Sequence, residues 1–197
     1  LHFDKYDRFI LPPVIKEEIG DAVPVDKGHV TVYLPAYDAH KLARIFKSIP
    51  SRRFHIFTKQ VTVVEEIGNS RLLPVDKSTF NKSLIDCNGV ITGAGFETPA
   101  EALHLGKKLL CIPIRGQYEQ FCNAAALMKL GITCHSRAGE GFGDLVDTWL
   151  AKANPIRINY KGTISALIER LMEARESMEQ EPHTELLSPL TSLLFPS

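Results

Sequence analysis

The sequence predicts an α/β protein with a Rossmann-like fold, in which a parallel sheet lies between two layers of helices. Two observations predict this class. Short apolar runs typical of buried strands alternate with stretches of helical periodicity, and a Gly-rich turn leads from one such run into a clear helix start. Crossovers between parallel strands are right-handed, which distributes the helices over both faces. We therefore expect a three-layer α/β/α arrangement.

The strands are recognised by runs of β-branched, aromatic and aliphatic residues between turn residues. The first is His29-Val30-Thr31-Val32-Tyr33-Leu34, and the second is Phe54-His55-Ile56-Phe57-Thr58. The run 61–66 is either a third strand or one arm of a hairpin. The remaining extended segments are expected at 71–75, 89–92 and 109–112.

The helices are recognised by apolar residues three and four positions apart. The pattern is strongest at 163–177, where one stripe holds Ile164, Leu167, Ile168, Leu171 and Met172. The other helices are expected at 38–48, 78–85, 99–105, 120–130 and 141–153.

The chain divides into four parts. Residues 1–27 contain Pro12, Pro13 and Pro24 without a sustained period, which predicts an interdomain linker or a strap lying on the domain. Residues 28–160 form the predicted Rossmann-like domain, 161–181 a C-terminal helix and 182–197 a tail whose order is left open. The chain begins at Leu1, without an initiator methionine, and we expect it to be part of a longer protein.

Composition narrows the classes of function. The 197 residues are 44% hydrophobic and 23% charged with a formal net charge of +0, which is typical of a soluble globular domain and argues against nucleic acid as a partner. No apolar run approaches the roughly 20 residues that cross a bilayer. The four cysteines form no CxxC pair, so we expect reduced core thiols and a cytoplasmic location.

The turn Gly93-Ala94-Gly95-Phe96-Glu97-Thr98 follows the expected strand 89–92. Glycines permit a tight turn, and the amides of the following helix could hold a nucleotide pyrophosphate. Two other interpretations remain open. Thr98 and Glu101 have the spacing of a capping box. The turn also begins like a dinucleotide fingerprint, although Thr98 stands where that pattern has its third glycine or alanine.

A second polar cluster, Glu119, Gln120 and Asn123, lies at the start of the helix expected at 120–130. A carboxylate and two amides suit sugar hydroxyls, but the local pattern alone favours an ordinary polar first turn. The seven histidines show no HExxH and no Cys/His spacing, which argues against a metal site. The hydrolase elbow GxSxG and the P-loop are also absent.

Together the two clusters resemble the donor-binding domain of glycosyltransferases with the GT-B fold, such as the peptidoglycan N-acetylglucosaminyltransferase and the UDP-glycosyltransferases. The resemblance covers residues 89–132 and includes the runs Glu101-Ala102-Leu103-His104-Leu105-Gly106 and Glu119-Gln120-Phe121-Cys122-Asn123-Ala124. It implies one half of a GT-B fold. The implied ligands of the donor diphosphate are Gly93, Ala94, Gly95 and Thr98, and Glu101 is implied to bind the ribose. The implied ligands of the donor sugar are Glu119, Gln120 and Asn123, and the base would lie over Val75 and Asp76.

The same resemblance implies a function. The chain would be the UDP-sugar-binding domain of a hexosyltransferase that needs no metal or other cofactor, with the loop at Tyr37-Asp38 approaching the phosphates and Leu11-Pro12-Pro13-Val14-Ile15 in the interdomain linker. The general base and acceptor groove belong to an N-terminal domain outside this chain, so we expect the chain alone to transfer no sugar. The acceptor is left open, as is peripheral membrane association of the full enzyme. The alternatives are half of a nucleotide-sugar 2-epimerase and a non-catalytic binding or docking module.

Overall fold

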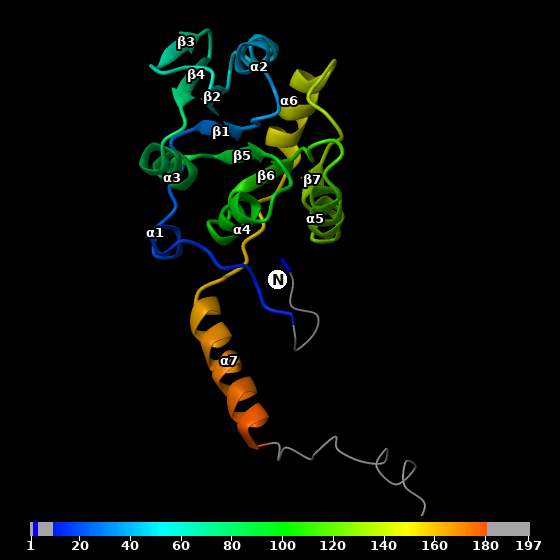
Figure 1. Cartoon of the computed structure of the whole chain (residues 1–197). Helices are drawn as coiled ribbons and strands as arrows, with labels where there is room; N and C mark the ends of the chain where they lie inside the picture. The colour runs from blue at the N-terminus through cyan, green and yellow to red at the C-terminus, as the bar shows by residue number, and fades with distance from the viewer. Residues whose placement is uncertain (1, 4–9, 181–197) are drawn as a thin grey trace, which may run out of the picture. The chain divides into compact units, whose positions relative to one another are not determined.

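A computed structural model describes residues 2–3 and 10–180. Residues 1–161 belong to one compact unit, and its centre is a seven-stranded sheet with the order β3-β4-β2-β1-β5-β6-β7 (Figure 1). The strands are β1 (His29–Tyr33), β2 (Arg53–Thr58), β3 (Glu65–Ile67), β4 (Ser70–Pro74), β5 (Gly89–Thr92), β6 (Lys108–Cys111) and β7 (Thr133–Cys134). Every neighbouring pair is parallel except β3 and β4, which are antiparallel.

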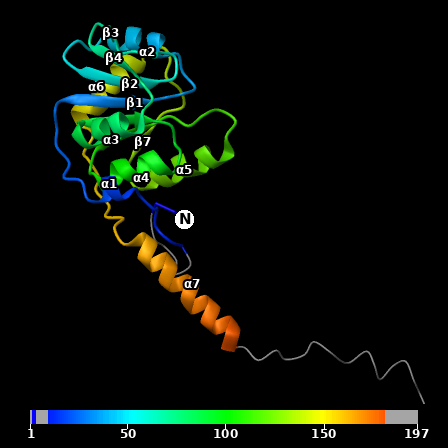
Figure 2. The same cartoon turned by 60° about the vertical axis from the view of Figure 1, so that its left-hand side comes forward.

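Helices cover both faces of the sheet (Figure 2). One buried cluster joins β1 and β2 to α2 (Ala39–Phe46) and α6 (Phe142–Lys152). The other joins β5 and β6 to α3 (Lys77–Asp86), α4 (Glu97–His104) and α5 (Tyr118–Lys129). The predicted three-layer α/β/α fold is therefore confirmed. Segment 61–66 contributes β3, which forms the antiparallel arm beside β4 rather than a parallel strand.

The side chains of β1 alternate between these two layers. Val30 and Val32 lie in the cluster with α2 and α6. His29 and Thr31 are also buried, but both contact Ser83 of α3 on the other face. Two polar residues in a central strand are thus satisfied by hydrogen bonds rather than exposed to water.

The segment before β1 contains α1 (Glu17–Gly20) and packs on the domain. Phe3 and Ile19 are buried in the same cluster as α4. The Oη hydroxyl of Tyr160 donates to the carbonyl of Phe3 over 2.8 Å, so the beginning and the end of this unit meet.

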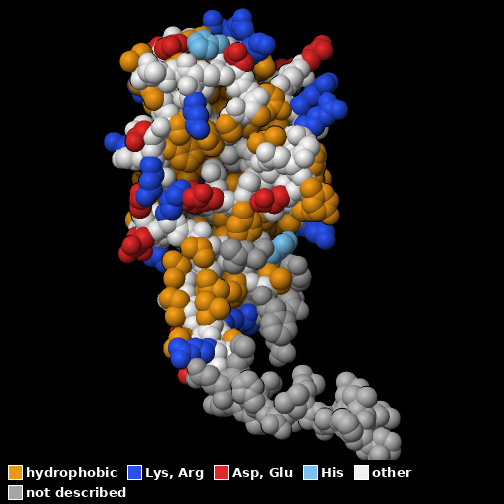
Figure 3. All heavy atoms as spheres, viewed as in Figure 1, with side chains coloured by type: hydrophobic (Ala, Val, Ile, Leu, Met, Phe, Trp, Pro, Cys, Tyr) orange, Lys and Arg blue, Asp and Glu red, His pale blue; other side chains and the backbone are white. Residues whose placement is uncertain are grey.

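The second unit, residues 162–197, contains α7 (Thr163–Gln180). Hydrophobic side chains gather along α7 (Figure 3), where Ile164, Ile168, Leu171 and Met172 of the predicted stripe are exposed. The tail expected at 182–197 lies outside the described residues. Among the described helices, none combines the length and the hydropathy that a membrane span requires.

Two local expectations are wrong. The capping box fails because Phe96, which already has helical backbone angles, occupies the N-cap position of α4, and no side chain caps this helix. Thr98 consequently lies inside the first turn and cannot act as the cap. Cys122 is exposed on α5 instead of lying in the core, whereas Cys87 and Cys111 are buried; all four cysteines are free thiols.

Candidate functional site

Two pockets lie side by side where β1, β4 and β5 end. The first has a volume of about 290 Å³ and is lined by Gly93, Gly95 and Gln120 among others. The second, of about 250 Å³, is lined by Val75 and Asp76 among others. Both pockets are lined by the same three residues, Tyr33, Glu97 and Thr98. The carboxyl ends of parallel strands are the usual place for a ligand in open α/β sheets.

The Gly-rich turn lies between β5 and α4 and is held in place by α5. The amide nitrogens of Ala94 and Ile114 both donate to Oε1 of Gln120, over 3.1 and 2.9 Å. Nδ2 of Asn123 donates to the carbonyl of Ala94 over 3.1 Å. The first backbone N–H groups of a helix have no intrahelical acceptor, so the start of α4 offers donors beside this turn.

The three residues of the second predicted cluster, Glu119, Gln120 and Asn123, lie in different surroundings. Gln120 both lines the first pocket and fixes the turn. Asn123 acts on the turn through Ala94 and lines neither pocket. Glu119 is exposed in the first turn of α5, outside both pockets. The sequence grouped these three side chains by spacing, but only Gln120 reaches a pocket.

Glu101 is completely buried, with 0% of its side chain exposed. Its one charged contact at short range is Nζ of Lys16, 3.1 Å from Oε1, and neither carboxylate oxygen accepts a well-directed hydrogen bond from the described residues. Burial raises the pKa of Glu101. The positive charge of Lys16 acts in the opposite direction but does not cancel this rise. Glu101 lines neither pocket itself, although Lys16 lines the second.

Lys16 is a site residue that no sequence pattern indicated, because it belongs to the segment before the domain. Its Nζ also lies 2.8 Å from Oε1 of Glu97. Burial acts to lower the pKa of Lys16, but hydrogen bonding to Glu97 and the charge of Glu101 outweigh it and raise the pKa. A cation from the N-terminal segment therefore lies between two carboxylates of α4.

The second pocket has an aromatic wall and an acidic edge. The rings of Tyr33 and Phe80 meet edge to face with centroids 5.6 Å apart. Asp76 caps α3, because its Oδ2 accepts hydrogen bonds from both the backbone nitrogen and the hydroxyl of Thr79 at 2.8 Å. These hydrogen bonds lower the pKa of Asp76.

The loop after β1 takes a different position from the one expected. Pro35 lines the first pocket, whereas Tyr37 and Asp38 do not. The Tyr37 hydroxyl accepts from the backbone nitrogen of Ala138, and Asp38 caps α2 by accepting from the backbone nitrogen of Lys41. No cluster of three or more potential metal ligands occurs in the part of the chain that the structure describes.

A parallel sheet with adjoining pockets at the carboxyl ends of its strands, beside a Gly-rich turn and a helix start, is the arrangement of a Rossmann-like domain. Residues 2–152 match glycosyl transferase family 1. The chain belongs to this family. The family match agrees with the glycosyltransferase resemblance of the two sequence clusters.

Solved structures with the same fold are also glycosyltransferases. The glycosyltransferase of kitacinnamycin is 15% identical with a TM-score of 0.52, over 86% of this chain and 48% of its own. VinC in complex with dTDP is 14% identical with a TM-score of 0.51, over 85% of this chain and 45% of its own. The spinosyn rhamnosyltransferase SpnG complexed with thymidine diphosphate is 17% identical with a TM-score of 0.51, over 85% of this chain and 48% of its own. The chain spans about half the length of these structures. No curated protein matches the sequence.

Proposed function

We propose that this chain is the nucleotide-sugar-binding domain of a glycosyltransferase, with a UDP-sugar as the donor of a hexosyl group. The observation that carries the proposal is the pair of adjoining pockets, which connects the Gly-rich turn with the loop at Val75 and Asp76. A nucleoside diphosphate needs such a pair, because its phosphates and its base require different surroundings.

The first pocket suits the diphosphate. Gly93, Gly95 and Thr98 line it, and the unpaired amides and the positive end of the dipole of α4 favour negative charge there. Ala94 contributes by shaping the turn, because its amide donates to Gln120 and its carbonyl accepts from Asn123. Leaving-group charge on the departing nucleotide would be held by these same N–H groups.

The second pocket suits the base, which would lie over Val75 and Asp76 and against the aromatic wall. The ribose is assigned to Glu101, because its two buried oxygens lack well-directed donors among the described residues and ribose hydroxyls are donors. Lys16 links that carboxylate to the pocket. The donor sugar is assigned to Gln120, with Glu119 and Asn123 as neighbours on α5.

The chain by itself is proposed to bind the donor without transferring it. Its matches span about twice its length, and the resemblance places the general base and the acceptor groove in the other half. Removal of a general base alone costs about 10²- to 10⁴-fold in rate. Residues 28–160 would then be the donor-binding domain, with 1–27 as the linker to the other half.

Calorimetric titration with UDP tests the proposal. Titrations with dTDP, GDP and NAD then show which base the site prefers. The informative variant is Gly95→Ala. An added Cβ there meets no atom within 4 Å, so it leaves the fold intact while narrowing the first pocket. Gly139→Ala is the matched control, because Gly139 also lies in a loop with ordinary backbone angles but lines neither pocket.

We expect saturable UDP binding that Gly95→Ala weakens by about tenfold. The added methyl group occupies space in the first pocket, and displacing the diphosphate from one charge-assisted hydrogen bond has an effect of this size. Gly139→Ala should bind as the parent chain does. A preference for dTDP would change the assigned base from uracil to thymine and would leave the proposed donor site in place. Equal weakening by both variants, or no binding of any nucleotide at millimolar concentration, would contradict the proposal.

A further inference from the structure

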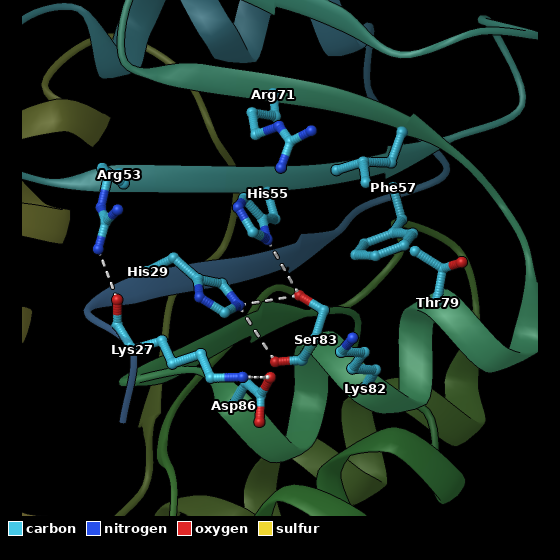
Figure 4. Close-up of a pocket in the computed structure, with 11 residues that line it drawn as sticks. Lys27, His29, Arg53, His55, Phe57, Arg71, Thr79, Lys82, Ser83 and Asp86 are labelled. Atoms are coloured by element: carbon cyan, nitrogen blue, oxygen red, sulfur yellow. Dashed lines mark hydrogen bonds and ion pairs between the residues drawn. The ribbon is translucent and has the colours of Figure 1, made fainter. Parts of the chain in front are cut away.

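A third pocket, of about 370 Å³, lies on the face of the sheet that α3 partly covers (Figure 4). Strands β1, β2 and β4 form its floor through His29, His55 and Leu73, and α3 closes one side through Lys82 and Ser83. It shares no lining residue with the two pockets of the donor site. The donor proposal therefore does not account for it.

Positive charge gathers in this pocket. Its lining contains the four cationic side chains of Lys27, Arg53, Arg71 and Lys82 but only one carboxylate, Asp86. The whole chain, by contrast, has a formal net charge of +0. Protein surfaces normally intersperse both signs, because like charges held together repel one another.

The acids nearby neutralise only part of this charge. Asp86 is paired with Lys27 at 2.5 Å, and Glu66, outside the pocket, is paired with Arg71 at 2.7 Å. The guanidinium of Arg53 donates to the backbone carbonyl of Lys27 and, in the part of the chain that the structure describes, forms no ion pair. Within the described residues, Lys82 makes no ion pair.

Two histidines add donors to the floor. The rings of His29 and His55 are stacked with centroids 3.9 Å apart. Figure 4 shows both rings turned toward Ser83. Nε2 of His29 lies 3.0 Å from Oγ of Ser83 and 3.2 Å from its carbonyl, and Oγ1 of Thr31 donates to the same carbonyl.

The Ser83 hydroxyl lies among three polar side chains. Its Oγ is 2.7 Å from Oγ1 of Thr31, 3.0 Å from Nε2 of His29 and 3.4 Å from Nδ1 of His55. Nε2 of His55 has no partner among the described residues. When it carries a proton, that nitrogen is a further donor in the cationic pocket.

We propose that this pocket binds the phosphate group of a small organic phosphate. A phosphate accepts hydrogen bonds from several directions, which suits a ring of Arg, Lys and His donors. Buried Phe57 and Leu73 provide apolar floor for the organic part. The volume is in the range of small-molecule pockets, which begins at about 300 Å³.

Binding should be linked to protonation of His55. Burial, then the charges of His29, Arg71 and Arg53, lower the pKa of His55 to about 4, and burial also lowers the pKa of His29. The other charged groups lining the pocket are Lys27, from the segment before β1, and Lys82 and Asp86 from α3. The negative charge of a bound phosphate stabilises the protonated form of His55 and so raises its pKa.

Histidine NMR signals titrated with inorganic pyrophosphate at pH 7 test the proposal. No histidine lines the donor pockets, so these signals report on the third pocket even if pyrophosphate also binds beside the Gly-rich turn. We expect saturable shifts of His29 and His55, and a pKa of His55 that is higher with pyrophosphate than without it. Glucose 6-phosphate, as an organic monoester, should produce the same shifts.

Arg71→Gln and Lys82→Gln should each weaken binding by about tenfold, because each removes a charged donor. Both residues are exposed, and Lys82 has no ion pair to lose among residues 2–3 and 10–180, so the fold should persist. Arg44→Gln on α2 is the matched control, since Arg44 is exposed and outside the pocket. Gly95→Ala should leave the shifts unchanged.

Two results would overturn the proposal. One is the absence of saturable shifts at tens of millimolar pyrophosphate. The other is an equal response of Lys82→Gln and Arg44→Gln, which would mean general screening by ions instead of a site. Because the readout is confined to this pocket, either result leaves UDP binding at the donor site unaffected.

Discussion

At the scale of single residues, the buried carboxylate of Glu101 is the least ordinary group in the site. Ionised carboxylates are rarely fully buried unless they are paired. Here the pair is formed by Lys16, which is separated from Glu101 by 85 positions in the chain and is still 29% exposed. Lys16 thus has a stabilising role in addition to the place it takes in the second donor pocket.

Lys16→Met should destabilise the domain. The substitution keeps an unbranched apolar side chain but removes the charge, so Glu101 either stays ionised without its countercharge or takes up a proton. Loss of one partner of a buried pair costs about 3–5 kcal/mol, and the partial exposure of Lys16 reduces our expectation to about 1–3 kcal/mol. Urea unfolding followed by the fluorescence of Trp149 measures this.

The pH dependence of the same variant checks the mechanism. The folded state raises the pKa of Glu101, so it holds the proton more tightly than the unfolded chain does, and stability falls as pH rises from the ordinary glutamate range through the raised pKa. Lys16→Met should raise that pKa further and steepen the fall. Adding Glu101→Gln should remove it. A variant whose stability loss is independent of pH would show that Lys16 acts through packing alone.

At the scale of elements, the Gly-rich turn and the helix after it were predictable, because their signals are local. Glycines, Pro99 and the apolar run 89–92 specify a strand, a turn and a helix start in sequence. The chemistry of the cap was not predictable in the same way. The backbone of Phe96 is already helical, so α4 begins at Glu97, and no side chain caps it.

Two helices of the domain are capped in the same way, and the pair separates stability from binding. Asp76 caps α3 and lines the second donor pocket, whereas Asp38 caps α2 and lines neither. Asp76→Ala and Asp38→Ala should each cost about 0.5–2 kcal/mol of stability, because each leaves helix amides without an acceptor. Chemical denaturation measures both costs.

Only Asp76→Ala should also change the affinity for UDP in calorimetric titration, since only Asp76 contacts the space assigned to the base. Both measurements are made on the folded variants at the same temperature. If both variants change affinity equally, the effect comes from stability, and Asp76 has no direct part in binding. If neither does, the base lies elsewhere.

At the scale of the whole molecule, the predictable part is whatever the sequence encodes locally or by resemblance. The alternation of strands and helices specified the layers, and the clusters around Gly93 and Gln120 specified the edge at which pockets occur. Contacts across long sequence separations were not predictable. Lys16 reaches α4 from the N-terminal segment, and the strands that gather the cations of the third pocket are neighbours only in the folded sheet.

The two ends of the first unit illustrate such a contact and lead to a final prediction. The hydroxyl of buried Tyr160 donates to the carbonyl of Phe3, whose ring packs against Phe96 with centroids 4.8 Å apart. Tyr160→Phe leaves that buried carbonyl without this donor and should cost about 1–2 kcal/mol in urea unfolding. Tyr118→Phe, at an 82% exposed position, should change stability by less than about 0.5 kcal/mol.

Phe96 also lines the first donor pocket. Tyr160→Phe should therefore speed hydrogen exchange at the amides of 95–97, and unchanged exchange there would show that the strap stabilises the domain without supporting the pocket.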